Sequence, residues 1–403
     1  MVRCVIIGAG LAGHRAAIEL RHLSPDASIV LLGAEAGLPY DRPPLSKAFL
    51  SGAASVRDIV LKDTERYEEL GIVHRPSTTV VAVDRAARLV RTESGEALSY
   101  DALLIATGSR PRRLPAAMDA PGLHYIRTRD DAERLGLALK RGGDMVVIGG
   151  GFIGLEVAAT ARQLGANVTV IEALPRLMAR GMPAFVGERV LDMHRQRGVV
   201  FALGTPVEAI TRRPDSAMDI RLNDRTLTAE TVVVGIGIVP NVELAERSGL
   251  GVTDGIVVDR ACRTSDPHIF AAGEVTAHPS GASGERRRIE SWRAASDQPL
   301  VAARSMLGIA AEYSDFPWLW SDQYDANLQT IGVPDGGARY VLKERDTSHW
   351  TLIALGEDGS ACGAVALNNG RDISMMRKHL RLGGPLPASV MAEFVEVTGR
   401  ARA

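Results

Sequence analysis

The sequence lacks the residue patterns that mark several common protein classes. Its three cysteines, Cys4, Cys262 and Cys362, are widely separated and form no C-x-x-C pair, so neither a disulfide framework nor a zinc site is expected. The nine histidines show no metal-ligand spacing, and no metal is predicted. A formal charge of −1 gives no reason to expect general attraction to nucleic acid. No apolar run reaches the roughly 18 residues of a membrane span.

No secretory leader precedes the first predicted strand. Residues 2–7 already have a strand pattern, with no charged stretch and apolar core in front of them, so we expect a cytoplasmic protein. Apolar residues are plentiful: 46% of the 403 positions are hydrophobic, although only 4% are aromatic. This length and composition predict about two to four domains with substantial cores.

Two glycine-rich segments are the most informative feature of the chain. Their glycines share one spacing: Gly8, Gly10 and Gly13 in the first segment, and Gly149, Gly151 and Gly154 in the second. Each segment follows an apolar strand pattern and opens an alanine-rich helix pattern. In that context the glycines allow a tight turn and close approach to a pyrophosphate, which the helix N-terminus then binds. One such segment could be an ordinary turn; two predict two nucleotides, with electrons passed between them.

An acidic residue is expected about 20 residues after each fingerprint, where it binds a ribose. In the second segment Glu172 ends a strand directly, which favours NAD(H) over NADP(H) because a carboxylate repels a 2′-phosphate. Arg176 and Arg180 follow closely and leave room for NADP(H), although both could be ordinary surface arginines. In the first segment the candidate is Glu35, and a solvated loop glutamate is an equal alternative.

The hydrophobic periodicity predicts an α/β fold with two Rossmann-like domains and a C-terminal α+β domain. We expect strands over residues 2–7, 28–32, 145–148, 167–171, 231–234, 350–355 and 361–367, and helices over 14–23, 154–164 and 373–380. A stiff proline-rich loop spans residues 39–47, because each proline fixes its own φ. After the second Rossmann-like domain, the chain is expected to return to the first through residues 269–274.

Five segments together resemble one family, the FAD-dependent NADH:ferredoxin reductases of oxygenase systems, and do so over essentially the whole chain. They are residues 43–47, 106–108, 149–156, 290–292 and 317–325. The resemblance implies a glutathione-reductase-like arrangement, with FAD on the first fingerprint and NADH on the second. The expected domains are an FAD-binding domain over 1–112 and 241–316, an NADH-binding domain over 113–240, and a C-terminal interface domain over 317–403.

The resemblance also implies roles for individual residues. Arg42 should face the FAD pyrophosphate, and Lys47 should lie at the reactive edge of the flavin, paired with Glu156. The alternative is a loop lysine and a helix-surface glutamate that never meet. Further residues complete the implied sites: Ala106, Thr107, Gly108, Glu274, Trp292 and Trp320 for FAD, and Arg180 and Gly237 for NADH. Trp292, Trp318 and Trp320 could equally form a hydrophobic seam between domains.

Two positions depart from the family pattern. Glu274 stands where the family commonly has aspartate, and Ala294 stands where an asparagine is usual. The longer carboxylate and the missing amide predict weaker or rearranged FAD contacts.

The implied reaction moves hydride from NADH to FAD and then single electrons to a [2Fe–2S] ferredoxin, or a rubredoxin, that feeds an oxygenase. The residues 49–52 contain serine but no cysteine, which argues against disulfide reductases and single-cysteine oxidases. A basic docking surface is expected for an acidic ferredoxin, either at Arg286–Arg288 with Arg293 or at Arg377, Lys378 and Arg381. A flavin NADH oxidase or quinone reductase and an NADH-sensing flavoprotein remain alternatives. We expect a monomer or a weak homodimer.

Overall fold

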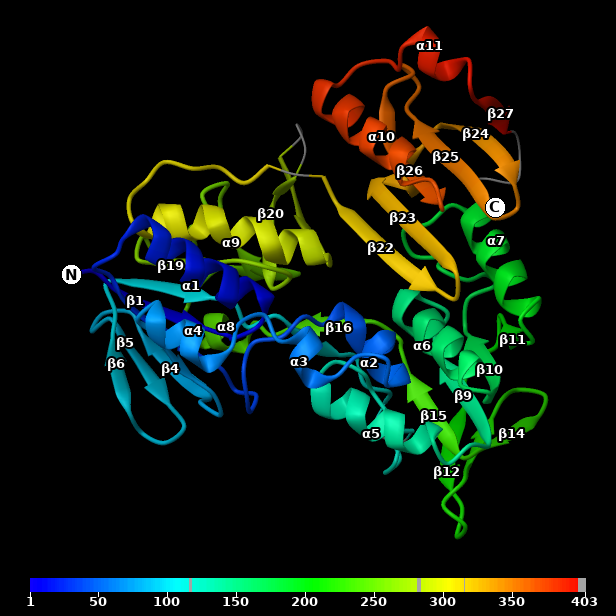
Figure 1. Cartoon of the computed structure of the whole chain (residues 1–403), viewed down its shortest axis with the longest axis horizontal. Helices are drawn as coiled ribbons and strands as arrows, with labels where there is room; N and C mark the ends of the chain where they lie inside the picture. Colours follow the sequence, from blue (N-terminus) through cyan, green and yellow to red (C-terminus); the bar gives the residue numbers. More distant parts are fainter. Residues whose placement is uncertain (116–117, 281–283, 315, 398–403) are drawn as a thin grey trace. The chain divides into compact units, whose positions relative to one another are not determined.

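The computed structural model describes residues 1–115, 118–280, 284–314 and 316–397. The chain folds into two compact units, each made of separate stretches of sequence (Figure 1). The first unit contains Met1–Asp41, Val56–Arg110 and Val239–Asp315, and the second contains Arg42–Ser55, Pro111–Ile238 and Phe316–Ala403. The second unit therefore includes both the predicted NADH-binding range and the predicted C-terminal range. The assignment of FAD and NADH to separate domains stays a prediction, and residues 398–403 of the expected last domain lie outside the described ranges.

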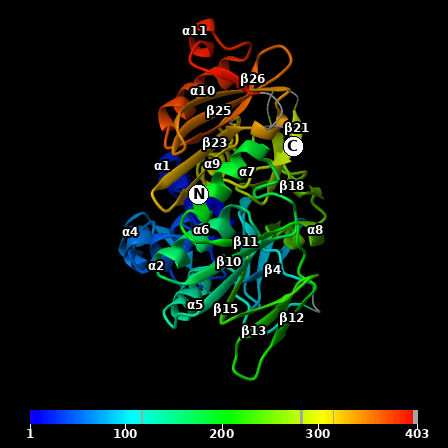
Figure 2. The ribbon, with the colours of Figure 1, turned by 90° about the vertical axis from the view of Figure 1, so that its right-hand side faces the viewer.

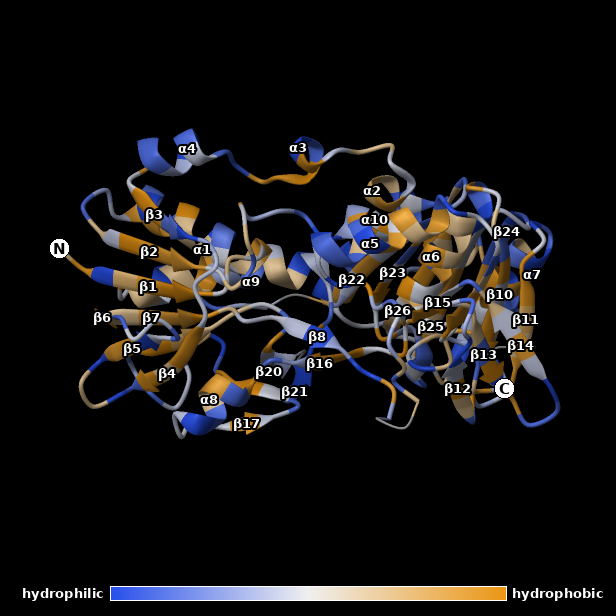
Figure 3. Cartoon of the chain, turned by 90° about the horizontal axis from the view of Figure 1, so that it is seen from below, coloured by the Kyte–Doolittle hydropathy of each residue, from blue (hydrophilic) through white to orange (hydrophobic). Residues whose placement is uncertain are grey.

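The first unit is built around a five-stranded parallel sheet in the order β19-β7-β1-β2-β3. Its strands are β1 (Arg3–Ile7), β2 (Ser28–Leu32), β3 (Ile72–Arg75), β7 (Ala102–Ile105) and β19 (Ile269–Ala271). β1 lies in the middle, so that Val5 is opposite Val30 on one side and Leu103 on the other. Apart from β3, these strands are almost unbroken apolar runs, because both faces of the sheet are covered. Figure 3 shows β1 and β2 mostly in the hydrophobic colour.

Helices cover one face of this sheet and a smaller antiparallel sheet covers the other. α1 (Leu11–Leu23) and α9 (Trp292–Met306) lie side by side on the first face (Figure 1). On the second face pack β4 (Val80–Asp84), β5 (Leu89–Thr92) and β6 (Ala97–Ser99). The remaining elements of the unit are α3 (Val56–Ile59), α4 (Thr64–Glu69), α8 (Glu243–Arg247), β17 (Val252–Thr253), β18 (Gly255–Val257), β20 (Thr276–Ser280) and β21 (Glu285–Arg288).

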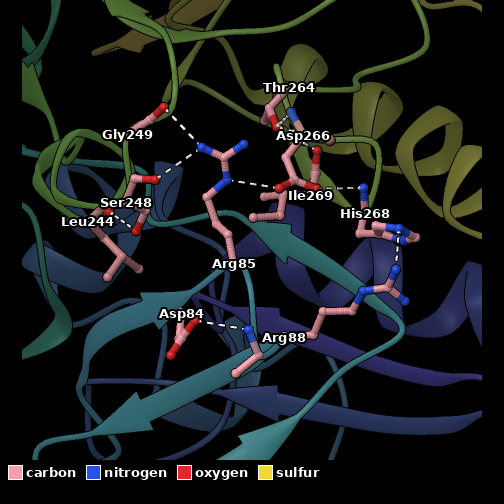
Figure 4. Close-up of polar contacts among 11 residues, drawn as sticks. Asp84, Arg85, Arg88, Leu244, Ser248, Gly249, Thr264, Asp266, His268 and Ile269 are labelled. Atoms are coloured by element: carbon pink, nitrogen blue, oxygen red, sulfur yellow. Dashed lines mark hydrogen bonds and ion pairs between the residues drawn. The ribbon is translucent and has the colours of Figure 1, made fainter.

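A polar cluster ties the β4–β5 turn to two distant segments of the first unit (Figure 4). Arg85 donates through Nε to Asp266 Oδ2 at 2.8 Å and through Nη1 to the carbonyl of Gly249 at 3.2 Å. Burial raises the pKa of Asp266, but hydrogen bonds from Arg85 and the His268 N–H outweigh it and hold that pKa below its usual value. The cluster is a structural cross-link, since it joins segments that are far apart in the sequence.

The second unit contains a four-stranded parallel sheet in the order β11-β10-β9-β15. Its strands are β9 (Asp144–Ile148), β10 (Asn167–Glu172), β11 (Val200–Leu203) and β15 (Thr231–Val234). One face packs against α5 (Arg129–Leu139), α6 (Phe152–Gln163) and Leu50 of α2 (Ala48–Ser51), which follows the short η1 (Pro43–Ser46). The other face packs against β12 (Ala209–Arg212), β13 (Met218–Arg221) and β14 (Thr226–Ala229). A two-stranded ribbon of β8 (Ser109–Pro111) and β16 (Ile238–Pro240) lies where the chain passes between the units.

The C-terminal part of the second unit is a six-stranded antiparallel sheet in the order β22-β23-β26-β25-β24-β27. The strands are β22 (Trp318–Gln323), β23 (Ala326–Gly332), β24 (Arg339–Asp346), β25 (His349–Leu355), β26 (Ala361–Leu367) and β27 (Val395–Val397). α10 (Gly370–Leu382) covers one face (Figure 2), and α7 (Ala184–Arg195) contributes to the core on the other. Two short elements, η2 (Pro334–Gly336) and α11 (Ala388–Met391), complete it.

The predicted fold class is confirmed: two parallel sheets each begin with a strand, a glycine turn and a helix, and an α+β part follows. Both fingerprint helices begin earlier than expected, at Leu11 and Phe152 rather than at His14 and Gly154. The third fingerprint glycine is therefore inside each helix, where it permits close packing on the preceding strand. No helix of the described ranges is long and apolar enough to cross a membrane.

Candidate cofactor and catalytic sites

The first glycine turn is shaped by close backbone contacts. Gly8 has φ +109°, and a Cβ there would lie 2.1 Å from the Ala106 carbonyl oxygen. A Cβ on Gly13 would lie 1.9 Å from the Gly8 carbonyl oxygen. Gly10, the N-cap of α1, has no neighbouring atom within 4 Å of that position and no side-chain cap. Two glycines thus allow the backbone to pack, and the third leaves open space at the helix N-terminus.

The second glycine turn repeats this geometry. Gly149 has φ +113°, and its Cβ would lie 2.4 Å from the Gly235 carbonyl oxygen, while that of Gly154 would lie 2.1 Å from the Gly149 carbonyl oxygen. Gly151 caps α6 with open space around its missing Cβ and without a side-chain cap. An open, uncapped helix N-terminus with available N–H groups fits a nucleotide diphosphate. Both turns therefore fit the cofactors that the sequence predicts.

Glu172 lies directly beside the second glycine turn. Its Oε2 accepts a hydrogen bond from the Gly150 N–H at 2.8 Å, and its Oε1 accepts one from the Leu174 N–H at 2.8 Å. These donors orient the carboxylate and leave further lone pairs for ribose hydroxyl groups. The structure therefore brings the predicted ribose ligand to the predicted pyrophosphate turn.

Arg176 and Arg180, the two arginines that kept NADP(H) as an alternative, both donate hydrogen bonds to backbone carbonyls. Arg176 donates to the carbonyl of Met182 at 2.8 Å. Arg180 donates to the carbonyl of Ile236 at 3.2 Å, and its Nη2 lies 3.5 Å from the Cβ position of Gly237. Arg180 and Gly237 thus come together as the expected site requires, whereas Arg176 braces the loop after β10.

The segments that should surround FAD in the first unit converge on the first glycine turn. A Cβ on Gly33 would lie 2.7 Å from Ala9 Cβ, so the chain after β2 passes close to the turn and leads to Glu35. The Glu35 carboxylate accepts a hydrogen bond from the Tyr40 hydroxyl at 2.5 Å. The position of Glu35 suits a ribose ligand, and that role stays a prediction.

The Ala106–Gly108 segment is fixed by Asn241, a residue that the sequence did not single out. The Asn241 amide donates to the Thr107 carbonyl at 2.9 Å, and the Thr107 hydroxyl donates to the Asn241 carbonyl at 2.8 Å. The Asn241 N–H also donates to the Gly108 carbonyl at 2.9 Å. The only sequence signal was its place directly after Pro240.

The two departures from the family pattern lie near a second unforeseen residue, Gln298. Its buried amide oxygen accepts from the Gly273 N–H at 2.8 Å, and a Cβ on Gly273 would lie 3.0 Å from Ala12 Cβ in the first turn of α1. Glu274 therefore follows a segment that is held against the first fingerprint helix. Ala294 is buried in the first turn of α9, whose N-cap Ser291 accepts from the Ala294 N–H at 3.1 Å.

The three tryptophans divide between the units. In the first unit, Trp292 Nε1 donates to Asp41 Oδ1 at 2.7 Å, which fixes the plane of the indole. Burial raises the pKa of Asp41, and this hydrogen bond opposes the shift. In the second unit, Trp318 and Trp320 stack at 5.1 Å between ring centroids. Asp41 was not foreseen, although it precedes Arg42 in the proline-rich loop.

Lys47 and Glu156 meet in the interior of the second unit. Lys47 Nζ lies 3.0 Å from Glu156 Oε1, and their side chains are only 17% and 4% exposed. The same carboxylate accepts hydrogen bonds from the hydroxyls of Ser46 and of Ser321, the latter at 2.7 Å. Arg42, from the same loop, donates to the Arg127 carbonyl at 2.5 Å. Three donors hold this buried carboxylate in one orientation, and the carboxylate in turn orients the lysine.

Comparisons with known proteins agree with this arrangement. Residues 2–298 match the family described as pyridine nucleotide-disulphide oxidoreductase, and residues 318–396 match the one described as reductase C-terminal. The ferredoxin–NAD(+) reductase component of an anthranilate 1,2-dioxygenase system from Burkholderia cepacia is 45% identical over 381 residues, 94% of each chain. Rhodocoxin reductase of Rhodococcus erythropolis is 38% identical over 96% of this chain and 92% of its own. Among solved structures, the covalent putidaredoxin reductase–putidaredoxin complex superposes with TM-score 0.92 at 33% identity, covering 97% of this chain and 95% of the other.

Proposed function

Because this chain belongs to the pyridine nucleotide-disulphide oxidoreductase family, we propose that it is an FAD-containing NADH:ferredoxin reductase. It takes hydride from NADH and passes single electrons to a [2Fe–2S] ferredoxin, or a rubredoxin, that feeds an oxygenase. The observation that carries the proposal is the presence of two open glycine turns at helix N-termini in one chain. Its relatives include ferredoxin–NAD(+) reductase components of oxygenase systems, in agreement with the family indicated by the sequence motifs.

The cysteines support an external electron acceptor. All three are free thiols, and Cys4 and Cys262 are buried. Burial raises the pKa of Cys4 to about 11 and also raises the pKa of Cys262, so neither is a reactive thiolate at neutral pH. Without a dithiol to receive the electrons, they leave for an external acceptor.

In this proposal, separate groups of residues bind FAD and NADH. FAD, when bound, accepts two electrons together and releases them one at a time. The first glycine turn and the N-terminus of α1 hold its diphosphate, with Glu35 at the ribose and Arg42 at the pyrophosphate. The second turn holds the NADH diphosphate, and Glu172 binds its ribose hydroxyls. The glycine turns, Glu35 and Glu172 are assigned from their contacts and from the family motifs, and Arg42 is assigned from the motifs alone.

Lys47 and Glu156 act at the flavin in this proposal. The lysine stabilises negative charge on the reduced ring, and the carboxylate holds the lysine in place. Glu156 begins the second turn of α6, next to the NADH-binding fingerprint, so one ion pair adjoins the segment on which the nicotinamide cofactor binds.

We propose the face of α10 as the docking surface for ferredoxin, rather than the group at Arg286–Arg288 and Arg293, because its cationic side chains line one surface depression. Arginines of the other group are neutralised within the first unit: Arg287 pairs with Glu285, Arg288 with Glu290 and Asp254, and Arg293 with Asp297, while Arg286 donates to a backbone carbonyl. On α10, Arg377, Lys378 and Arg381 line one surface depression of about 360 Å³. The Arg377 guanidinium also lies 5.4 Å from the Trp318 ring centroid. This cationic face suits an acidic ferredoxin.

The test is NADH-dependent reduction of cytochrome c by the FAD-loaded protein, with and without a panel of [2Fe–2S] ferredoxins and rubredoxins. Strong stimulation by one of them is the expected result. Turnover with oxygen or quinones alone would favour an oxidase or quinone reductase instead. Slow reoxidation, with a change of oligomeric state on reduction, would favour an NADH sensor. The cytoplasmic location and the monomer or weak homodimer remain predictions.

A further inference from the structure

A line of buried polar side chains runs from Glu156 to His194 within the second unit. Ser321 Oγ lies 2.7 Å from Glu156 Oε1, Gln323 Nε2 lies 3.0 Å from Ser321 Oγ, and Gln323 Oε1 lies 2.7 Å from His194 Nε2. Ser321 and His194 have no exposed surface, and Gln323 is 2% exposed. β22 supplies the middle of the line, between Glu156 on α6 and His194 on α7 (Figure 1). The proposed reaction uses Glu156 but assigns no role to Gln323 or His194.

The chemistry of the groups permits only one direction of donation along this line. Glu156 is a carboxylate that accepts from Lys47, so the single Ser321 proton is donated to it. The Ser321 oxygen must then accept from the Gln323 amide nitrogen, which turns the amide oxygen toward His194. An amide oxygen accepts only, so His194 Nε2 carries the proton. Every donor therefore points toward Glu156.

At the outer end of the line, His194 and Tyr324 have the protonation states that this direction of donation requires. His194 Nδ1 lies 3.1 Å from the Tyr324 hydroxyl, so the phenol donates to it. Burial lowers the pKa of His194 to about 4, against an opposing hydrogen bond with Gln323, so the imidazole is neutral at pH 7. Burial raises the pKa of Tyr324 to about 12, although Arg197 opposes the shift. Both groups keep one fixed role near neutral pH, and Arg197 closes the line by stacking 4.5 Å from the Tyr324 ring centroid.

We propose that Ser321 and Gln323 are positioning residues for Glu156, and that His194 fixes the orientation of the Gln323 amide. Ser321 and Lys47 share one carboxylate oxygen, and Ser46 occupies the other. The carboxylate plane, and with it the Lys47 ammonium, is thus fixed from both sides. The inference rests on the proposed role of the Lys47–Glu156 pair and adds to it the residues that orient it. Without the Gln323 donor, the Ser321 hydroxyl can rotate away from Glu156.

The kinetic test compares variants of the full, FAD-loaded chain by stopped-flow reduction with NADH. Ser321→Ala and Gln323→Met should each slow flavin reduction about tenfold, the effect of one hydrogen bond to a charged group, with the apparent Kd for NADH unchanged. Gln323→Glu should not rescue the rate, because it offers an acceptor where Ser321 needs a donor. Thr351→Val is the matched control: its hydroxyl, in the same sheet, is equally buried and donates to the carboxylate of Asp372 at 2.7 Å. That variant should reduce at the wild-type rate.

A second readout does not depend on activity. Nitrogen-15 NMR of histidine-labelled protein, with His194 assigned from a His194→Gln variant, should show the Nε2–H tautomer in the wild type and in Gln323→Glu. Gln323→Met should weaken that preference, because only the Tyr324 hydroxyl then favours the Nε2–H form. A proton on Nδ1 in the wild type would overturn the direction of the chain.

The outcomes separate this inference from the proposed function. If Glu156→Gln is slow while Ser321→Ala and Gln323→Met reduce at the wild-type rate, the positioning role is refuted and the ion pair keeps its role. If Glu156→Gln itself reduces at the wild-type rate, the proposed role of the pair fails, and the positioning role fails with it.

Discussion

Replacing Glu172 with alanine tests the assignment of the second glycine turn to NADH. The carboxylate is held beside the turn by the N–H groups of Gly150 and Leu174, both at 2.8 Å. A hydrogen bond from a ribose hydroxyl to this charged group contributes about 1.5–3 kcal/mol. Its loss should raise the KM for NADH about 10- to 150-fold. The KM for NADPH should not rise in parallel, because the charge that repels a 2′-phosphate is also removed.

The assay is steady-state reduction of a dye acceptor with each nucleotide, with FAD content measured in parallel. Glu230→Ala provides the control, since the Glu230 carboxylate accepts from the Asp144 N–H at 2.6 Å at the opposite end of β9. That variant loses a comparable backbone contact without touching the turn, and it should keep the wild-type ratio of the two KM values. An unchanged NADH-to-NADPH preference in Glu172→Ala would refute the assignment.

Three further outcomes are expected. Gly151→Ala adds a methyl group that meets no protein atom within 4 Å, so the variant should fold and retain FAD while its KM for NADH rises about tenfold or more; a normal KM would remove the turn from the site. Asp266→Asn should lower the melting temperature at pH 7, and the wild-type advantage should shrink as the pH falls below about 4, because a carboxyl with a depressed pKa loses its stabilising effect on protonation; a difference that is constant across pH in thermal melts would contradict this. Lys378→Gln should raise the KM for ferredoxin at low ionic strength, whereas Arg287→Gln, which removes an arginine already paired with Glu285, should have little effect; equal effects would argue against docking on α10.

Local patterns in the sequence predicted the central strands of both parallel sheets, but not the edge strands β3 and β11. The strands at 28–32 and 231–234 were expected with the bounds that β2 and β15 have. α9 was missed because Pro299 lies inside it, a residue that normally interrupts a helix. The pairing of β19 with β7 brings together residues more than 160 positions apart, and no local signal specifies the order of strands in such a sheet.

The two glycine turns and Glu172 could be predicted from the sequence because each lies at or directly after a strand end, whereas Lys47 and Glu156 were indicated only by the family resemblance. The residues that orient these groups could not be predicted. Asn241 and Ser321 act through contacts with residues 134 and 165 positions away in the sequence, and Gln298 acts through the Gly273 N–H, 25 positions away. Their side chains are common polar types, and only the folded chain shows which carbonyl or carboxylate they meet.

The interrupted course of the chain through its two units has a consequence for biosynthesis. The first sheet begins with β1, but its edge strand β19 and the helix α9 that covers α1 come from residues 269–306. During translation, the hydrophobic core around β1 and α1 therefore cannot be completed until most of the polypeptide has been synthesised. The four-stranded sheet of the second unit draws all its strands from residues 144–234, and such shorter separations favour earlier folding. We expect this sheet to form first during translation, and α1, the helix that follows the first glycine turn, to acquire its final packing only near the end of synthesis.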